Sequence, residues 1–393
     1  MAITSGDLES DVRDRTSARM LIGLEGLRFA AAFAVLVLHY RYFYFSGGTL
    51  SGYLPEQQPF YDALAPFYTN GYCGVELFWC ISGFIFAWKY NVSIGAGEIS
   101  FRRFAILRFA RLYPLHFATL LAVALLQAIY FHSHVEWFVF QANDIKHFAL
   151  NLVFASYWGF QPGYSFNGPS WSISAEILVY VLFFFCCRLA GNRARLATPI
   201  ALGAFPLAAL AQFLFSTQSA VLLAADFFYL GVLTCQLYTM IMAQTRRARL
   251  VLNWLVVGVT SALLLLTGFG QLSIEAASLV MLPAIVLTFQ LLVPDRNARV
   301  NRCLTFLGDM TYASYLLQFP VQLAIVQVMA WTGPWTEDLR GTRTFFLAYV
   351  LTVCVLARIV FRTFERPAQM ALRRTLLGWP AARSRPGVAS TIA

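Results

Sequence analysis

Long apolar segments alternate with short polar ones along this chain. Ten of the apolar segments approach twenty residues, the length that a helix needs to cross the hydrocarbon core of a bilayer. These predicted spans lie at 22–44, 71–90, 110–131, 171–188, 198–216, 219–243, 250–269, 273–293, 304–331 and 344–364. A further apolar stretch, 147–160, falls short of that length. The pattern predicts an all-α polytopic membrane protein with about ten transmembrane helices in one bundle.

Composition agrees with this class of fold. Of the 393 residues, 59% are hydrophobic and only 12% are charged, whereas a soluble protein carries roughly twice that share of charge. We expect one membrane domain at 21–370, a polar N-terminus at 1–20 and a disordered tail at 371–393. The N-terminus has no hydrophobic run of its own, so the first span is expected to act as an uncleaved signal.

Basic residues determine the predicted orientation. The net charge of +10 comes from short clusters between the apolar segments, which argues against nucleic acid as a partner. With 147–160 not crossing, the clusters fall on one side, so both termini are predicted to be cytoplasmic. Residues 132–170 then form an outer loop with a dipping or interfacial helix. The expected location is the cytoplasmic (inner) membrane of a bacterium.

Ionisable residues inside spans are costly and indicate function. Arg28 and His39 lie eleven residues apart in the first span, so both point along nearly the same helix face. This topology places His39, Glu76 and Glu176 at one depth, about 7–8 Å beneath the outer boundary. A carboxylate beside a histidine favours general-base chemistry, so these three are the predicted catalytic residues. The alternative is that each acid pairs with a neighbouring helix for packing.

Arginines gather at the opposite, inner side. Arg108 and Arg111 are three residues apart and can share a helical face. Guanidinium groups suit phosphate oxygens, which predicts a phosphate-bearing ligand. The predicted ligand-binding set is Arg28, Arg102, Arg103, Arg108 and Arg111. Snorkelling of the arginines to lipid headgroups is the alternative.

An ordered set of motifs resembles the acyltransferase-3 family of integral membrane O-acyltransferases. The segments that carry the resemblance are Gly26-Leu-Arg-Phe-Ala with His39, Gly74-Val-Glu-Leu-Phe-Trp-Cys-Ile-Ser-Gly-Phe84, Arg102-Arg103 with Arg108-Phe-Ala-Arg111-Leu-Tyr-Pro114, Trp171-Ser-Ile-Ser-Ala-Glu176, Tyr312-Ala-Ser-Tyr-Leu-Leu-Gln-Phe-Pro320 and Phe364-Glu-Arg-Pro367. They run in family order over residues 20–370.

The resemblance implies a ten-helix enzyme that takes an acyl group, with acetyl expected, from cytoplasmic acyl-CoA. The implied acceptor is a hydroxyl of a glycan or lipid-linked sugar, such as exopolysaccharide or lipopolysaccharide. Arg28 and His39 match an essential family pair, and Gln318 stands where the family often has His. Neither a metal nor a permanently bound cofactor is expected.

Two aromatic residues on the predicted outer loop are candidates for acceptor binding. Tyr164 and Trp171 could stack on sugar rings, although an interfacial aromatic belt explains them equally well. The expected reaction is deprotonation of the acceptor hydroxyl by His39, with an acyl-histidine relay as its variant. The main rival function is a secondary transporter with a buried His/Glu ion path.

Overall fold

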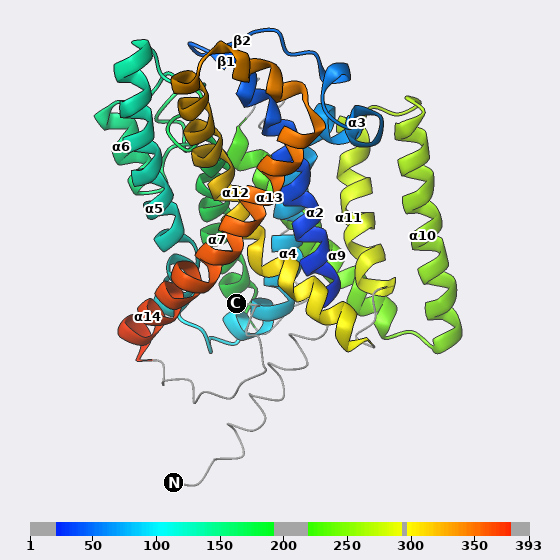
Figure 1. Cartoon of the computed structure of the whole chain (residues 1–393). Coiled ribbons are helices and arrows are strands. Elements are labelled where there is room, and N and C mark those ends of the chain that lie inside the picture. Colours follow the sequence, from blue (N-terminus) through cyan, green and yellow to red (C-terminus); the bar gives the residue numbers. More distant parts are fainter. Residues whose placement is uncertain (1–20, 192–218, 293–296, 379–393) are drawn as a thin grey trace.

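A computed structural model describes residues 21–191, 219–292 and 297–378. Within those ranges, nine helical segments are long and apolar enough to cross a membrane. They are Ile22–Tyr44, Cys73–Gly95, Phe101–His134, Gly168–Ala190, Ala220–Met242, Arg246–Gly268, Ile274–Leu292, Ala298–Thr332 and Arg343–Leu377. The remaining predicted span, 198–216, lies outside the described residues, as does the N-terminal segment 1–20. The prediction of an all-α polytopic membrane protein is confirmed (Figure 1).

The main helices follow one another in chain order. They are α2 (Ile22–His39), α4 (Cys73–Gly95), α5 (Phe101–His134), α7 (Trp171–Ala190), α9 (Ala220–Met242), α10 (Arg246–Gly268), α11 (Ile274–Leu292), α12 (Ala298–Thr332), α13 (Arg343–Val360) and α14 (Arg366–Leu377).

Shorter elements connect these helices. They are the 3-10 turns η1 (Tyr40–Tyr44), η2 (Pro55–Gln57), η3 (Gly168–Ser170) and η5 (Pro334–Gly341), the strands β1 (Phe45–Ser46) and β2 (Thr49–Leu50), the helices α3 (Tyr61–Asn70) and α6 (Ile145–Leu152), and the π-helical turn η6 (Phe361–Glu365). The two strands pair antiparallel, with Phe45 opposite Leu50.

The two ends of the bundle differ. Strands β1 and β2 and helix α3 lie at one end, which we call the hairpin end (Figure 1). The starts of α5, α10 and α12 lie at the other end together with α14, and we call it the basic end. The first five residues of α5, α10 and α12 include Arg102, Arg103, Arg246, Arg247, Arg249, Arg299 and Arg302.

Several helices begin earlier than hydropathy predicts. Helix α5 starts at Phe101 instead of residue 110, because the Ser100 hydroxyl caps it by accepting the Arg103 backbone N–H at 3.2 Å. Helix α12 starts at Ala298 instead of residue 304, where Asn297 acts as the cap. Hydropathy marks the part of a helix that crosses the lipid, whereas capping residues mark where the helix begins.

The predicted disordered tail is partly wrong. The last span continues through η6 into α14, so residues 371–377 are helical. Helix α14 packs against α5, which gives this polar segment a surface on which to fold. The rest of the tail, from residue 379, lies outside the described residues.

The stretch 147–160 contains one short helix, as predicted, and no helix long enough to cross a membrane. Its helix, α6, has eight residues and begins at the cap residue Asp144, whose carboxylate accepts the His147 backbone N–H at 2.9 Å. Asn151 ties α6 to its surroundings, because its side chain donates to the Ser165 hydroxyl and its carbonyl bonds the His116 ring. Residues 132–170 are therefore a connection with one short helix.

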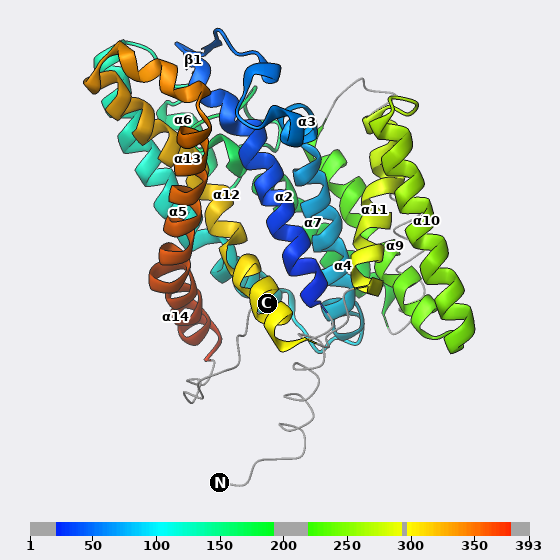
Figure 2. The ribbon, with the colours of Figure 1, turned by 45° about the vertical axis from the view of Figure 1, so that its right-hand side comes forward.

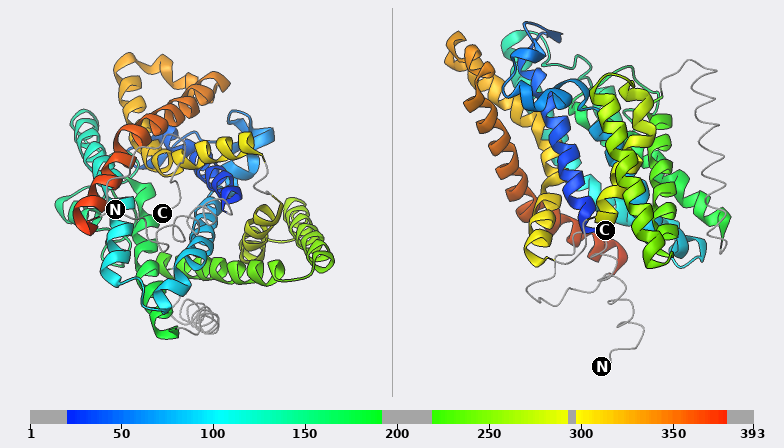
Figure 3. Two further views of the ribbon diagram at one scale, coloured as in Figure 1. Left: turned by 90° about the horizontal axis from the view of Figure 1, so that it is seen from below. Right: turned by 90° about the vertical axis from the view of Figure 1, so that its right-hand side faces the viewer.

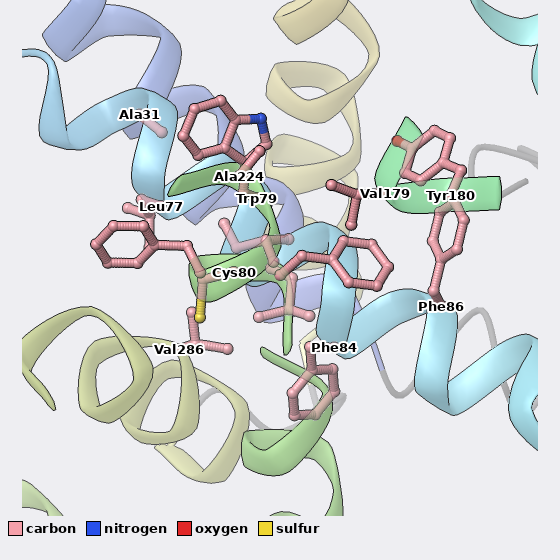
Figure 4. Close-up of a cluster of buried hydrophobic side chains, with 14 of the residues drawn as sticks. Ala31, Leu77, Trp79, Cys80, Phe84, Phe86, Val179, Tyr180, Ala224 and Val286 are labelled. Atoms are coloured by element: carbon pink, nitrogen blue, oxygen red, sulfur yellow. The ribbon is translucent and has the colours of Figure 1, made fainter. Parts of the chain in front are cut away.

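Helices α4 and α9 cross closely at two glycines. A Cβ on Gly83 would collide with the Phe228 carbonyl, and one on Gly231 would collide with the Cys80 carbonyl. Small residues let transmembrane backbones approach in this way. Around the crossing, Trp79, Cys80 and Phe84 of α4 lie among side chains of α7, α9 and α11 (Figure 4). This packing fixes one wall of the site described below.

Helices α10 and α11 stand at one side of the bundle (Figures 2 and 3). Helix α10 packs mainly on α11 and is almost entirely exposed on its other faces. The opposite side holds α5, α12, α13 and α14, with α2, α4 and α7 between the two groups. The ionisable residues predicted to form the site lie on α2, α4, α5 and α7, and not on α10 or α11.

Candidate functional site

A cavity lies in the centre of the bundle, between α2, α4, α5, α7 and α12. It holds about 930 Å³ of empty space, part of which is open to the exterior. Polar and aromatic side chains make up much of its wall. The lining residues are Arg28, Phe78, Trp79, Ser82, Ile85, Phe86, Arg108, Arg111, Leu112, Ser172, Ile173, Glu176, Tyr180, Thr311, Tyr312 and Tyr315.

The cavity is elongated, and its two ends differ in chemistry. From Phe78 to Phe86 it follows eight residues of α4, a rise of about 12 Å. Near Phe86 lies the Arg108 guanidinium, 4.9 Å from the ring centroid. At the other end the Phe78 ring lies 5.7 Å from that of Tyr315. One end is therefore cationic and the other aromatic and neutral.

Three of the five predicted ligand-binding arginines line this cavity, and each has a different partner. Arg28 pairs with buried Glu25, three residues earlier on α2, at 3.4 Å. Arg111 forms an ion pair with buried Glu365. Arg108 donates to the Tyr90 hydroxyl at 2.6 Å and forms no ion pair within 4.0 Å among the described residues.

Arg102 and Arg103 stand apart from this group. Both are exposed on the first turn of α5, and neither lines the cavity. The cap at Ser100 starts the helix there, so about one and a half turns separate Arg103 from Arg108. The structure thus divides the predicted set into cavity arginines and surface arginines.

Glu176 lies in the cavity with the arginines. Its carboxylate is next to the Ser82 and Tyr180 hydroxyls and interacts electrostatically with Arg28 and Arg108. One carboxylate oxygen, Oε1, is buried and has no hydrogen-bond partner among the described residues. A free acceptor atom in a cavity wall is suited to an N–H or O–H group of a ligand.

His39 lies beyond the neutral end of the cavity and does not line it. Its ring stacks on that of Tyr42, with centroids 4.7 Å apart, and lies beside the Gln318 side chain. Gln318 in turn donates to the Tyr315 carbonyl at 2.9 Å. Gln318 therefore contacts both His39 and Tyr315, and Tyr315 belongs to the cavity wall.

The predicted contact between His39 and a carboxylate is wrong. No acid in the described parts of the chain lies within 4.0 Å of the His39 ring. Glu176 faces the cavity, whereas Glu76 lies beside Cys73 and interacts with Glu275 of α11. The topology gave the three residues a common depth, but depth does not fix the direction in which a side chain leaves its helix.

The two predicted acceptor residues lie together. The rings of Tyr164 and Trp171 are 6.0 Å apart, and Tyr157 stacks on Tyr164 at 5.4 Å. Trp171 also contacts Trp79 of the cavity wall at 5.6 Å. Burial and then the neighbouring Tyr164 raise the pKa of Tyr157, so its hydroxyl remains a proton donor at neutral pH. We call Tyr157, Tyr164 and Trp171 the aromatic cluster.

Sequence reasoning missed several residues of this region. Tyr157 carried no motif, and Tyr315 drew attention only as part of the Tyr312–Pro320 segment. Gln318 stood out only as the position where the family often has His. That segment also holds Pro320, which cannot donate to the Leu316 carbonyl four residues earlier. The side chain of buried Asn167 donates to that carbonyl instead, at 3.0 Å. A proline inside a predicted span was the available signal for such a partner.

Comparison with known proteins adds independent information. The profile of the acyltransferase-3 family, described as an acyltransferase domain, matches residues 21–361. The acyltransferase MdmB of Streptomyces mycarofaciens is 30% identical over 176 residues, which cover 43% of this chain and 40% of that protein. Protein 2 in the picA locus of Rhizobium radiobacter is 32% identical over 127 residues, 29% of this chain and 65% of that protein. Both matches span less than two thirds of the relative. No solved structure matches.

Proposed function

Because this chain belongs to the acyltransferase-3 family, we propose that it is a membrane O-acyltransferase that uses acyl-CoA as its donor. The acceptor in this proposal is a hydroxyl group of a glycan or lipid-linked sugar, and the acyl group is acetyl. The observation that carries the proposal is the central cavity, which is cationic at one end and leads toward His39 at the other. The surrounding membrane is the inner membrane of a bacterium.

The donor enters from the basic end. Positively charged segments favour the cytoplasmic side, so the cationic end of the cavity faces the compartment that holds acyl-CoA. Arg108 binds the phosphates, whereas Arg28 and Arg111, each paired with an acid, line the cavity along which the pantetheine arm extends. Glu176 accepts an amide N–H of that arm through its free oxygen. The thioester then lies at the neutral end, near Tyr315.

The chemical step takes place next to His39. The imidazole removes the proton of the acceptor hydroxyl, and the hydroxyl oxygen attacks the thioester carbonyl. The C–S bond breaks as the C–O bond forms, and the departing CoA thiolate takes the proton from the imidazolium. In this scheme Gln318, not a carboxylate, is the polar side chain beside the imidazole.

The acceptor approaches from the hairpin end. The aromatic cluster adjoins the neutral end of the cavity through Trp79, and Tyr164 interacts electrostatically with Tyr42, the ring that stacks on His39. Tyr164 is 43% exposed, so one face of the cluster is open to an approaching sugar ring. Acceptor and donor thus meet from opposite ends of the bundle.

Transfer of labelled acetyl groups tests the proposal. Membranes that contain the wild-type protein are incubated with acetyl-CoA labelled in its acetyl group, and the label in extracted glycans is counted. His39→Ala abolishes the label, whereas His132→Ala, an exposed histidine at the end of α5, leaves it unchanged. Both variants must reach the membrane in wild-type amounts. Retained transfer in the His39 variant would contradict the role of this residue.

A further inference from the structure

Helix α14 brings another arginine to the cationic end of the cavity. The helix packs along α5, and the Arg373 guanidinium interacts electrostatically with Arg108 and Arg111. Two of its nitrogens, Nε and Nη2, are buried and have no hydrogen-bond partner among the described residues. The Arg108 Nε atom is also buried and has no hydrogen-bond partner among the described residues.

Among the described residues, no acid forms an ion pair with either Arg108 or Arg373. Glu365 forms its ion pair with Arg111. Within the described segments, no carboxylate oxygen lies within 4.0 Å of a side-chain nitrogen of Arg108 or Arg373. Both guanidinium groups interact with the Tyr90 hydroxyl, to which Arg108 donates a hydrogen bond at 2.6 Å. Two guanidinium groups that approach each other without an acid repel unless an anion lies between them.

We propose that Arg108 and Arg373 form a phosphate-binding site at the cationic mouth of the cavity, and that the phosphates of the donor nucleotide occupy it. This inference rests on the proposed function, because it assumes that acyl-CoA enters the cavity. Unpaired guanidinium nitrogens are donors with the geometry that phosphate oxygens accept. Arg108 belongs to the cavity wall and Arg373 to a helix outside it, so the nucleotide lies outside the bundle while the pantetheine arm lies inside.

A phospholipid headgroup offers the same phosphate chemistry, since α14 lies at the basic end. The donor nucleotide and the lipid headgroup predict different results in a binding experiment. If the site binds the donor, its loss weakens the binding of acetyl-CoA but not that of acetyl-pantetheine, which lacks the nucleotide. If the site binds a lipid headgroup, its loss changes the affinity for neither compound.

The test uses the full-length protein in phosphatidylcholine nanodiscs. Binding of acetyl-CoA and of acetyl-pantetheine is measured for the wild type, Arg373→Gln and Arg374→Gln. Arg374 is the exposed neighbour on the same helix and receives the same change, so it controls for altered net charge. A parallel set of nanodiscs contains phosphatidylglycerol, and lipid that remains bound to the protein is counted by native mass spectrometry.

The expected result is an acetyl-CoA affinity that falls about 10- to 100-fold in Arg373→Gln, with acetyl-pantetheine unaffected and Arg374→Gln equal to the wild type. Equal acetyl-CoA affinity in Arg373→Gln and the wild type overturns the donor assignment. Loss of bound phosphatidylglycerol alone assigns the site to a headgroup, and no change in either ligand overturns the site itself. A wild-type protein that binds no acetyl-CoA would instead refute the proposed function.

Discussion

Arg111 of α5 and Glu365 of η6 form a buried ion pair between residues 254 positions apart in the chain. Their side chains are 14% and 2% exposed. The pair joins two motifs, Arg108-Phe-Ala-Arg111 and Phe364-Glu-Arg-Pro367, and places the π-helical turn beside the cavity wall. It also distinguishes the two arginines, since Arg111 pairs with a carboxylate and Arg108 donates to the Tyr90 hydroxyl.

Breaking this ion pair is expected to destabilise the protein. Arg111→Gln leaves the Glu365 carboxylate buried without a cation, which typically costs about 3–5 kcal/mol. The measurement is the midpoint of thermal unfolding in detergent. Arg111→Gln combined with Glu365→Gln removes both charges and should recover much of the loss. A single variant as stable as the wild type would show that the pair does not hold η6 in place.

Most of the fold could be predicted from the sequence because the bilayer imposes a length on each apolar segment. The starts of α5 and α12 were wrong by several residues, since Ser100 and Asn297 act through hydrogen bonds that hydropathy does not register. Helix α14 was missed for a related reason. Its residues are polar, and it is ordered by packing on α5, a contact between distant parts of the chain.

The candidate site could be predicted in its residue types and only partly in its contacts. The sequence predicted arginines at one end and His39 at the other. Arg108 lines the cationic end of the cavity, whereas His39 lies outside the cavity, beside Gln318. Glu76 and Glu176 were wrongly assigned as neighbours of His39. Their depth follows from position along a helix, but their direction depends on how α4 and α7 rotate against their neighbours, which one sequence does not give.

The glycines at the α4–α9 crossing lead to a second prediction. Gly231→Ala places a methyl group against the Cys80 carbonyl, and backbone cannot move aside as a side chain can. Overpacking of this kind costs about 1–3 kcal/mol, so a lower unfolding midpoint and a lower yield of monodisperse protein are expected. Gly258→Ala on α10 is the matched control, because nothing lies within 4 Å of its added Cβ. Equal behaviour of the two variants would argue against the close crossing.

Asn167 and Pro320 are expected to depend on each other. Asn167→Leu removes the donor to the Leu316 carbonyl and should destabilise the protein by about 1–3 kcal/mol, because that carbonyl is then unpaired inside the bundle. Pro320→Ala restores a backbone N–H that reaches the same carbonyl. Thermal unfolding of both single variants and the double variant measures their coupling. Losses that simply add would mean that the Asn167 side chain does not replace the missing helical bond.

Gln318 is expected to position His39 for transfer. The Gln318 side chain is fully buried, lies beside the imidazole and is held by the Tyr315 carbonyl at 2.9 Å. Gln318→Met keeps a similar volume but removes the amide, so turnover should fall by about tenfold or more, as expected for loss of a buried polar contact of about 1.4 kcal/mol.

Two measurements distinguish a fall in turnover caused by disturbed packing from one caused by loss of His39 positioning. The KM for acetyl-CoA should stay unchanged, because the donor phosphates bind at the other end of the cavity. Gln327→Met makes the same change at a buried glutamine of the same helix, about 13 Å farther along its axis, and should preserve turnover. If both variants lost turnover equally together with thermal stability, Gln318 would be a packing residue, and His39 would be positioned by its stacking on Tyr42 alone.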